Sequence, residues 1–177
     1  VKVKDKVEDV ALDFPLPSEY LLATIHRAEN TASSNLKTIF DSLCNIDHKI
    51  IIPLHPRTKK RLKEEKLFDF VNSHLIIIDP LGYLHFTKLL QNAKAVITDS
   101  GGVQKEAYWN HVPCVTVRDN TEWIETVNAN GNILSQPSEI GEKLNYMLSR
   151  NISFNDNLYG FDDTSRRILT ILENFEE

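Results

Sequence analysis

The chain has 177 residues, of which 41% are hydrophobic, and its formal net charge at pH 7 is -5. A chain of this length can bury one substantial core, so we predict one domain. The negative charge gives no reason to expect nucleic acid as a partner, and no apolar run approaches the roughly 20 residues that a membrane-spanning helix needs, so we expect no membrane association either. Cys44 and Cys114 lack the spacing of a metal site. They are most simply free thiols in a reducing compartment, and we therefore expect a cytoplasmic protein without a metal or other cofactor.

The amino-terminal residues show little sign of a folded domain. Residues 1–14 are charged and only loosely periodic, and Pro15 and Pro17 then interrupt any helix. We therefore predict that residues 1–17 are a linker or the remnant of a preceding domain. Residues 18–177 are predicted to form the domain itself.

Short apolar runs alternate with amphipathic segments along the rest of the chain. In chain order, the patterns predict a strand over 20–25, a helix capped by Ser33 and Ser34, a strand over 50–54, a helix over 58–67, a strand over 75–78, a helix over 83–92, a strand over 95–98, a helix starting at Val103, strands over 114–117 and 131–134, and helices over 138–148 and 165–175. Such alternation implies βαβ units. We therefore predict an α/β fold with a doubly wound parallel sheet and helices on both faces.

Residues 95–107 join a predicted strand to a predicted helix through a turn that contains two adjacent glycines. Gly101 and Gly102 leave the backbone uncovered by any Cβ, so an anion can approach the amides of the helix N-terminus, where the helix dipole favours negative charge. Glu106 follows one turn later, where a carboxylate can accept hydrogen bonds from vicinal hydroxyl groups such as those of a ribose. The alternative is that the polar residues before the glycines only cap the helix and that the glycines only tighten the turn.

Polar and basic residues follow several of the predicted strands. They are His26 and Arg27 after the first strand, His55 and Arg57 after the second, the glycine turn itself, and Arg118 to Glu122 after the fifth. Taken singly, each has an ordinary explanation as a structural histidine or as an arginine paired to a carboxylate. In open parallel sheets, however, ligands bind at the carboxyl ends of the strands. We therefore predict a site for a phosphorylated ligand, in which imidazole and guanidinium groups face the helix N-terminus.

Five polar motifs stand in order along the chain, namely TIHRAENT (24–31), PLHPR (53–57), DPLGY (79–83), TDSGGVQKEA (98–107) and RDNTEW (118–123). They occur in the order seen in UDP-N-acetylglucosamine 2-epimerases, and the chain resembles the carboxyl-terminal half of that family. The resemblance implies a Rossmann-like domain that forms one half of a GT-B two-domain architecture, with the nucleotide sugar in the cleft between the halves. It also implies a missing amino-terminal Rossmann-like domain, which in the family supplies the acidic residues that act at C2 of the sugar. We therefore expect the isolated chain to be inactive.

The resemblance assigns roles to individual residues. For UDP binding, it implies the diphosphate at Ser100, Gly101 and Gly102, the ribose at Glu106, and the uracil beside Leu81 and Phe86. His26 would contact the diphosphate and, as the catalytic residue, assist the departure of UDP. The resemblance further suggests a cleft lined by Arg27, His55, Arg57 and Arg118.

The family's reaction eliminates UDP to give an unsaturated sugar and then adds UDP back with C2 inverted. The resemblance thus implies interconversion of UDP-GlcNAc and UDP-ManNAc for cell-surface polysaccharide biosynthesis, with a UDP-sugar as ligand and a homodimer as the full-length protein. In this chain Trp123 stands where many members carry an arginine followed by proline, and the Thr-Glu-Trp form resembles a subgroup that includes epimerases of diacetamido uronic acid sugars. Asp163 replaces a glycine of the segment that, in the family, leads a last helix back to the other domain.

Three alternatives therefore stand beside the UDP-GlcNAc 2-epimerase half. The first is half of a UDP-diacetamido-uronic acid 2-epimerase. The second is the nucleotide-binding domain of a GT-B glycosyltransferase, which shares the glycine turn and the ribose-binding glutamate but usually lacks the two histidine motifs. The third is a noncatalytic nucleotide-sugar sensor or scaffold.

Overall fold

A parallel β-sheet with helices on both faces organises the chain. The computed structural model describes residues 7–160 and 163–175. In these residues the strands are β1 (Leu21–Thr24), β2 (Ile50–Pro53), β3 (Ile76–Ile78), β4 (Val96–Thr98), β5 (Cys114–Thr116) and β6 (Asn132–Leu134). They pair in the order β3-β2-β1-β4-β5-β6, and every pairing is parallel. The prediction of a doubly wound, Rossmann-like α/β fold is confirmed.

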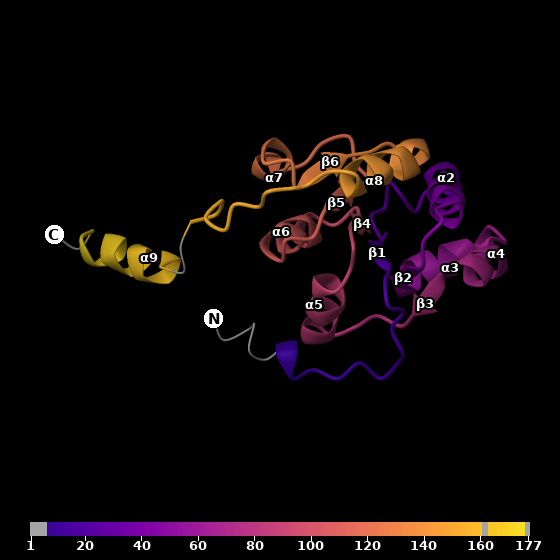
Figure 1. Cartoon of the computed structure of the whole chain (residues 1–177), viewed down its shortest axis with the longest axis horizontal. Helices are drawn as coiled ribbons and strands as arrows, with labels where there is room; N and C mark the ends of the chain where they lie inside the picture. Colours follow the sequence, from indigo (N-terminus) through magenta and orange to yellow (C-terminus); the bar gives the residue numbers. More distant parts are fainter. Residues whose placement is uncertain (1–6, 161–162, 176–177) are drawn as a thin grey trace.

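Helices cover both faces of this sheet (Figure 1). They are α2 (Ser33–Cys44), α3 (Pro56–Glu64), α4 (Phe68–His74), α5 (Tyr83–Gln91), α6 (Gly101–Trp109), α7 (Ile124–Asn128), the 3-10 helix η1 (Pro137–Glu139), α8 (Ile140–Leu148) and α9 (Thr164–Glu173). Figure 1 shows α5 and α6 on one side of the central strands and α2, α3 and α4 on the other. Every helix in the described ranges is too short or too polar to cross a lipid bilayer.

Each face of the sheet has its own hydrophobic core. In β1, Leu21 and Ala23 belong to one core and Leu22 to the other. The first core also contains side chains of α2, α3, α4 and α8, and the second contains side chains of α5 and α6. Because both faces are covered, the strands read as continuous apolar runs rather than as alternating polar and apolar residues.

The chain builds the sheet outwards in two opposite directions from β1 and β4, and the position of the site follows from this topology. From β1 the chain continues through β2 to the edge strand β3, whereas from β4 it continues through β5 to the opposite edge strand β6. The connections that leave β1 and β4 therefore run to opposite sides. Such a switch point leaves a crevice at the carboxyl ends of the two strands.

Several predicted boundaries differ from the structure. The cap of α2 is Ala32, so Ser33 and Ser34 lie inside the helix and do not cap it. Helix α3 starts at Pro56, because a proline is favourable in the first turn, where its missing N–H costs nothing. The α8 helix starts at Ile140, after η1. The short helices α4 and α7 were not predicted, since seven and five residues give too few turns for a clear period.

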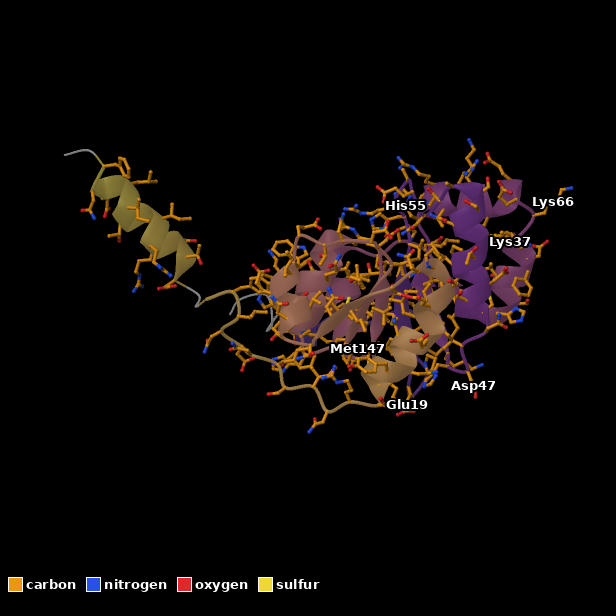
Figure 2. The ribbon with its side chains drawn as sticks, turned by 90° about the horizontal axis from the view of Figure 1, so that it is seen from above. Glu19, Lys37, Asp47, His55, Lys66 and Met147 are labelled. Carbon is orange, nitrogen blue, oxygen red and sulfur yellow. The ribbon has the colours of Figure 1, made fainter. Side chains whose placement is uncertain are left out.

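The amino-terminal segment and α9 differ in how they contact the sheet domain. Leu12 and Phe14 pack against the second core, so this part of the chain lies against the domain. Helix α9 instead projects away from the body, and its side chains point into open space in Figure 2, at the end of the molecule opposite the labelled Lys66. Ile168 and Leu172 of α9 are more than half exposed. The domain boundary at residue 17 stays a prediction.

Candidate functional site

A cavity of about 350 Å³ lies at the carboxyl ends of the central strands. The loops after β1 and β2 contribute His26 and His55, and the loop after β3 contributes Leu81. Tyr83 and Phe86 of α5, Ser100 just before α6, and Gly102, Val103 and Glu106 of α6 complete the wall. The fold thus gathers seven of the residues singled out from the sequence, namely His26, His55, Leu81, Phe86, Ser100, Gly102 and Glu106.

The N-terminus of α6 opens onto this cavity. Ser100 is its N-cap residue, but the serine side chain makes no capping hydrogen bond. The N–H groups of Gly101, Gly102 and Val103 have no hydrogen-bond acceptor among residues 7–160 and 163–175, and the first bond of the helix runs from Gln104 N to Ser100 O. Such donors, together with the helix dipole, form an anion site. The glycines therefore lie in the first helical turn, two residues earlier than the predicted start of the helix.

The two glycines face different surroundings. A Cβ on Gly102 would meet no atom within 4 Å, and Gly102 lines the cavity. A Cβ on Gly101 would lie 2.8 Å from Oε1 of Glu122, on the side away from the cavity lining. Gly102 therefore leaves the backbone open to a ligand, whereas Gly101 makes room for the carboxylate of a neighbouring loop.

Asp99 holds the loop that carries His26. Its carboxylate is fully buried and accepts hydrogen bonds from the backbone N–H of His26 at 3.0 Å, from that of Arg27 at 2.9 Å and from Asn30 Nδ2 at 3.1 Å. Asn30 also donates to the carbonyl of Val117, which ties this loop to the one after β5. The chain therefore fixes the His26 loop next to the strand that leads into the glycine turn, through a residue that the sequence suggested only as a helix cap.

Threonine hydroxyls link the carboxyl ends of β1 and β4 at the cavity. The Oγ1 atoms of Thr24 and Thr98, in register on β1 and β4, lie 2.6 Å apart. Oγ1 of Thr98 also accepts the backbone N–H of Ser100 at 2.9 Å. These bonds set the separation between the end of β1 and the start of α6, and so the width of the crevice.

The two histidines of the site lie side by side. The ring centroids of His26 and His55 are 6.1 Å apart, and both rings line the cavity. Nδ1 of His55 accepts the backbone N–H of Arg57 at 3.1 Å, so this nitrogen carries no proton in that bond. The Arg57 side chain is exposed and lies outside the cavity lining.

Glu106 projects into the cavity from α6, one turn after Gly102. Burial raises the pKa of its carboxyl group, and the nearby ammonium of Lys105 opposes that rise. A carboxylate with few water molecules around it gains more from hydroxyl donors of a ligand than an exposed one does. The local chemistry suits recognition of a hydroxyl pair.

Arg27 and Arg118 lie beside the first turn of α6 and outside the cavity lining. Both contact Glu122, with Nη1 of Arg118 at 2.7 Å from Oε2 and Nη2 of Arg27 at 3.9 Å from Oε1. A hydrogen bond from its own backbone lowers the pKa of Glu122, and Arg118 and Arg27 add to this effect. Arg118 also lines a second, polar cavity of about 270 Å³ between the loops after β1, β5 and β6.

Comparison with known proteins gives a consistent result. The family model described as UDP-N-acetylglucosamine 2-epimerase matches residues 2–173. A UDP-N-acetylglucosamine 2-epimerase homolog of Methanococcus maripaludis is 44% identical over an alignment of 161 positions, which covers 88% of this chain and 45% of that protein. The UDP-2,3-diacetamido-2,3-dideoxy-D-glucuronate 2-epimerase of Pseudomonas aeruginosa is 39% identical over an alignment of 188 positions, which covers 97% of this chain and 52% of that protein.

A solved structure shows the same likeness. The UDP-GlcNAc 2-epimerase of Methanocaldococcus jannaschii, in complex with UDP-GlcNAc and UDP, superposes with a TM-score of 0.82 at 40% identity. The superposition covers 98% of this chain and 48% of that one. The chain therefore spans about half the length of the relatives it matches.

Proposed function

This chain belongs to the UDP-N-acetylglucosamine 2-epimerase family, and on that premise we propose that it is the UDP-binding half of a UDP-sugar 2-epimerase. The observation that carries the proposal is one cavity that is lined both by His26 and by the first turn of α6, whose three N–H groups have no acceptor in the described residues. The proposed binding domain begins near residue 18, and residues 1–17 connect it to the missing half. Helix α9, with its exposed apolar side chains, is proposed to return towards that half.

The proposed ligand lies along the wall of the cavity. The diphosphate accepts hydrogen bonds from the amides of residues 101–103, and the ribose hydroxyls donate to Glu106. The uracil lies beside Leu81 and Phe86, which pack against the second core and therefore offer a rigid apolar surface. His55 completes the rim next to His26.

In the proposed reaction, the bond between C1 of the sugar and the β-phosphate oxygen breaks while a proton leaves C2. UDP then adds back to the unsaturated sugar, and a proton returns to the opposite face of C2. Negative charge grows on the departing β-phosphate. Fixed amides and the imidazole of His26 stabilise that charge more in the transition state than in the ground state. The acidic groups that act at C2 belong to the missing half.

The isolated chain is expected to bind UDP weakly and to show no turnover of UDP-GlcNAc, because it supplies one wall of the cleft. Titration calorimetry with UDP and a coupled assay for released UDP measure the two quantities. Sub-micromolar affinity for UDP, or turnover of UDP-GlcNAc by the isolated chain, would contradict the proposal that a complete site needs both halves. Absence of UDP binding at millimolar ligand would overturn the proposed function.

In the full-length protein with both halves, His26→Ala is expected to lower kcat by about 100-fold while raising the dissociation constant of UDP by less than about tenfold. Its proposed role lies in the transition state, so binding should suffer less than turnover. Steady-state kinetics and a UDP titration of the same preparation test the split. Equal losses in both would show that His26 only binds the ligand.

For Glu106→Gln, stability and binding should change in opposite directions. Because burial raises the pKa of Glu106, folding favours its protonated form, and the contribution of this group to stability is lost as pH rises through that raised pKa. The variant should therefore be at least as stable as the parent at pH 7 and should show a flatter stability profile above pH 4.5, the ordinary value for the group.

The same variant should bind UDP about tenfold more weakly than the parent. Its affinity for 2′-deoxy-UDP should equal that of the parent, because this analogue lacks the 2′-hydroxyl whose hydrogen bond to Glu106 the substitution removes. In the parent chain, UDP affinity should fall as pH drops through the raised pKa of Glu106. The exposed Glu142→Gln on α8 serves as the control. A variant that still prefers UDP over the deoxy analogue as strongly as the parent would refute the ribose assignment.

The sugar remains a choice between two proposals. The likeness to the Pseudomonas aeruginosa enzyme and the Thr-Glu-Trp motif support a diacetamido uronic acid as the sugar. Offering both nucleotide sugars to the full-length protein, with solvent deuterium as a marker at C2, separates them. Deuterium in N-acetylglucosamine alone selects UDP-GlcNAc, and deuterium in the uronic acid alone selects the other.

A further inference from the structure

A buried polar network lies beneath the loop that joins β5 to α7. At its centre is Gln104 of α6, which is fully buried. Its Oε1 atom accepts hydrogen bonds from Thr121 Oγ1 at 2.6 Å and from Asn132 Nδ2 at 3.2 Å, and its Nε2 atom donates to the carbonyl of Ser100 at 3.3 Å. Buried polar groups are costly unless they are satisfied, and a satisfied network fixes one arrangement of the segments that it joins.

Through Asn132 of β6, the network continues to β5 and α7. Asn132 accepts a hydrogen bond from Thr116 at the end of β5 and donates to Thr126 of α7. Thr126 in turn donates to the carbonyl of Trp123, and Thr121 accepts the backbone N–H of the same residue. The loop is therefore tied to the first turns of α6, to the sheet and to α7 at once.

This loop carries the charged groups that lie next to the helix N-terminus. Glu122 follows Thr121 directly, and its Oε1 atom lies 2.8 Å from the Cβ position of Gly101 and 3.9 Å from Nη2 of Arg27. Its Oε2 atom pairs with Arg118 at 2.7 Å. Two guanidinium groups and one carboxylate leave one net positive charge beside the free amides of α6. The electrostatic potential at the free amides therefore depends on where the carboxylate of Glu122 lies relative to the two guanidinium groups.

We propose that Gln104 and Thr121 are positioning residues for diphosphate recognition, and that their hydrogen bond holds Glu122 and its two arginines beside the first turn of α6. The inference rests on the proposed UDP site. In the proposed UDP complex, neither Gln104 nor Thr121 touches the ligand. If the bond is lost, Glu122 is free to turn from the Gly101 side of this first turn towards the side that lines the cavity, where a carboxylate competes with the diphosphate for the same donors.

The test compares Thr121→Val with Thr121→Ser in this chain. Valine keeps the shape of threonine but has no hydroxyl, whereas serine keeps the hydroxyl. Each variant and the parent are titrated with UDP and with uridine, which lacks the phosphates, and thermal unfolding is recorded alongside. We expect Thr121→Val to weaken UDP binding by about tenfold and to leave uridine binding unchanged. Thr121→Ser, which keeps the hydroxyl, should bind UDP with the affinity of the parent.

Three outcomes would overturn the inference. Equal weakening of both ligands would point to general disruption of the domain, and a lower unfolding temperature with unchanged UDP affinity would leave the bond a purely structural role. Failure of serine to restore UDP affinity would show that the hydroxyl is not the acting group. If the parent binds neither ligand, the proposed function itself fails and this inference with it, which separates the two failures.

Discussion

Asp99→Leu is expected to lower the free energy of unfolding by about 3 kcal/mol, because three donors around this buried carboxylate then lose their shared acceptor. The donors are the backbone N–H groups of His26 and Arg27 and the side-chain amide of Asn30. Leucine has the same branched arrangement of side-chain heavy atoms and is not smaller, so the substitution leaves the donors unsatisfied without opening a cavity. Urea unfolding followed by circular dichroism measures the change.

Asp99→Asn is the matched control. Asparagine keeps one acceptor oxygen at the same place, so its cost should be about half that of leucine. A loss below about 0.5 kcal/mol for Asp99→Leu, which is ordinary for a surface position, would show that this carboxylate does not hold the His26 loop.

Gly102→Val is expected to weaken UDP binding by at least about tenfold while leaving the free energy of unfolding within about 0.5 kcal/mol of the parent. The new side chain would meet no protein atom near its Cβ and would project into the cavity beside the free amides. It would therefore obstruct the approach of the diphosphate without disturbing the core. Calorimetric titration with UDP and urea unfolding measure the two quantities.

Gly141→Val provides a closely matched control for that experiment. Gly141 is the second residue of α8, as Gly102 is of α6, and a Cβ there also meets nothing within 4 Å. It lies outside both cavities. The control should share the small change in stability and bind UDP like the parent. Equal UDP affinity in the two variants would argue against the glycine turn as the phosphate site.

The sheet was predictable because its signal is local. Strands that are buried on both faces appear as short apolar runs, such as Ile50–Pro53, and their alternation with helices implies the parallel topology. The same rule places the loops after the strands on one edge, which is why His26 and Glu106 could be predicted to share a site. The structure brings them to one cavity.

What the sequence could not reveal depends on contacts between distant segments. Asp99 follows an apolar strand, as a helix cap often does, and its three donors lie 69 to 73 residues away in the chain. Gln104 has the pattern of any helical residue, since its partner Thr121 comes from a separate loop. Even the two glycines look alike in the sequence, and only their neighbours distinguish the one beside Glu122 from the one that lines the cavity.

An amide-resolved NMR titration of this chain with UDP tests the proposal that the first turn of α6 binds the diphosphate of a UDP-sugar. The N–H signals of Gly101, Gly102 and Val103 are expected to shift most and to saturate together, whereas uridine at the same concentration leaves them in place. Saturating UDP that leaves these three amides unshifted, while signals elsewhere in the domain move, would contradict it.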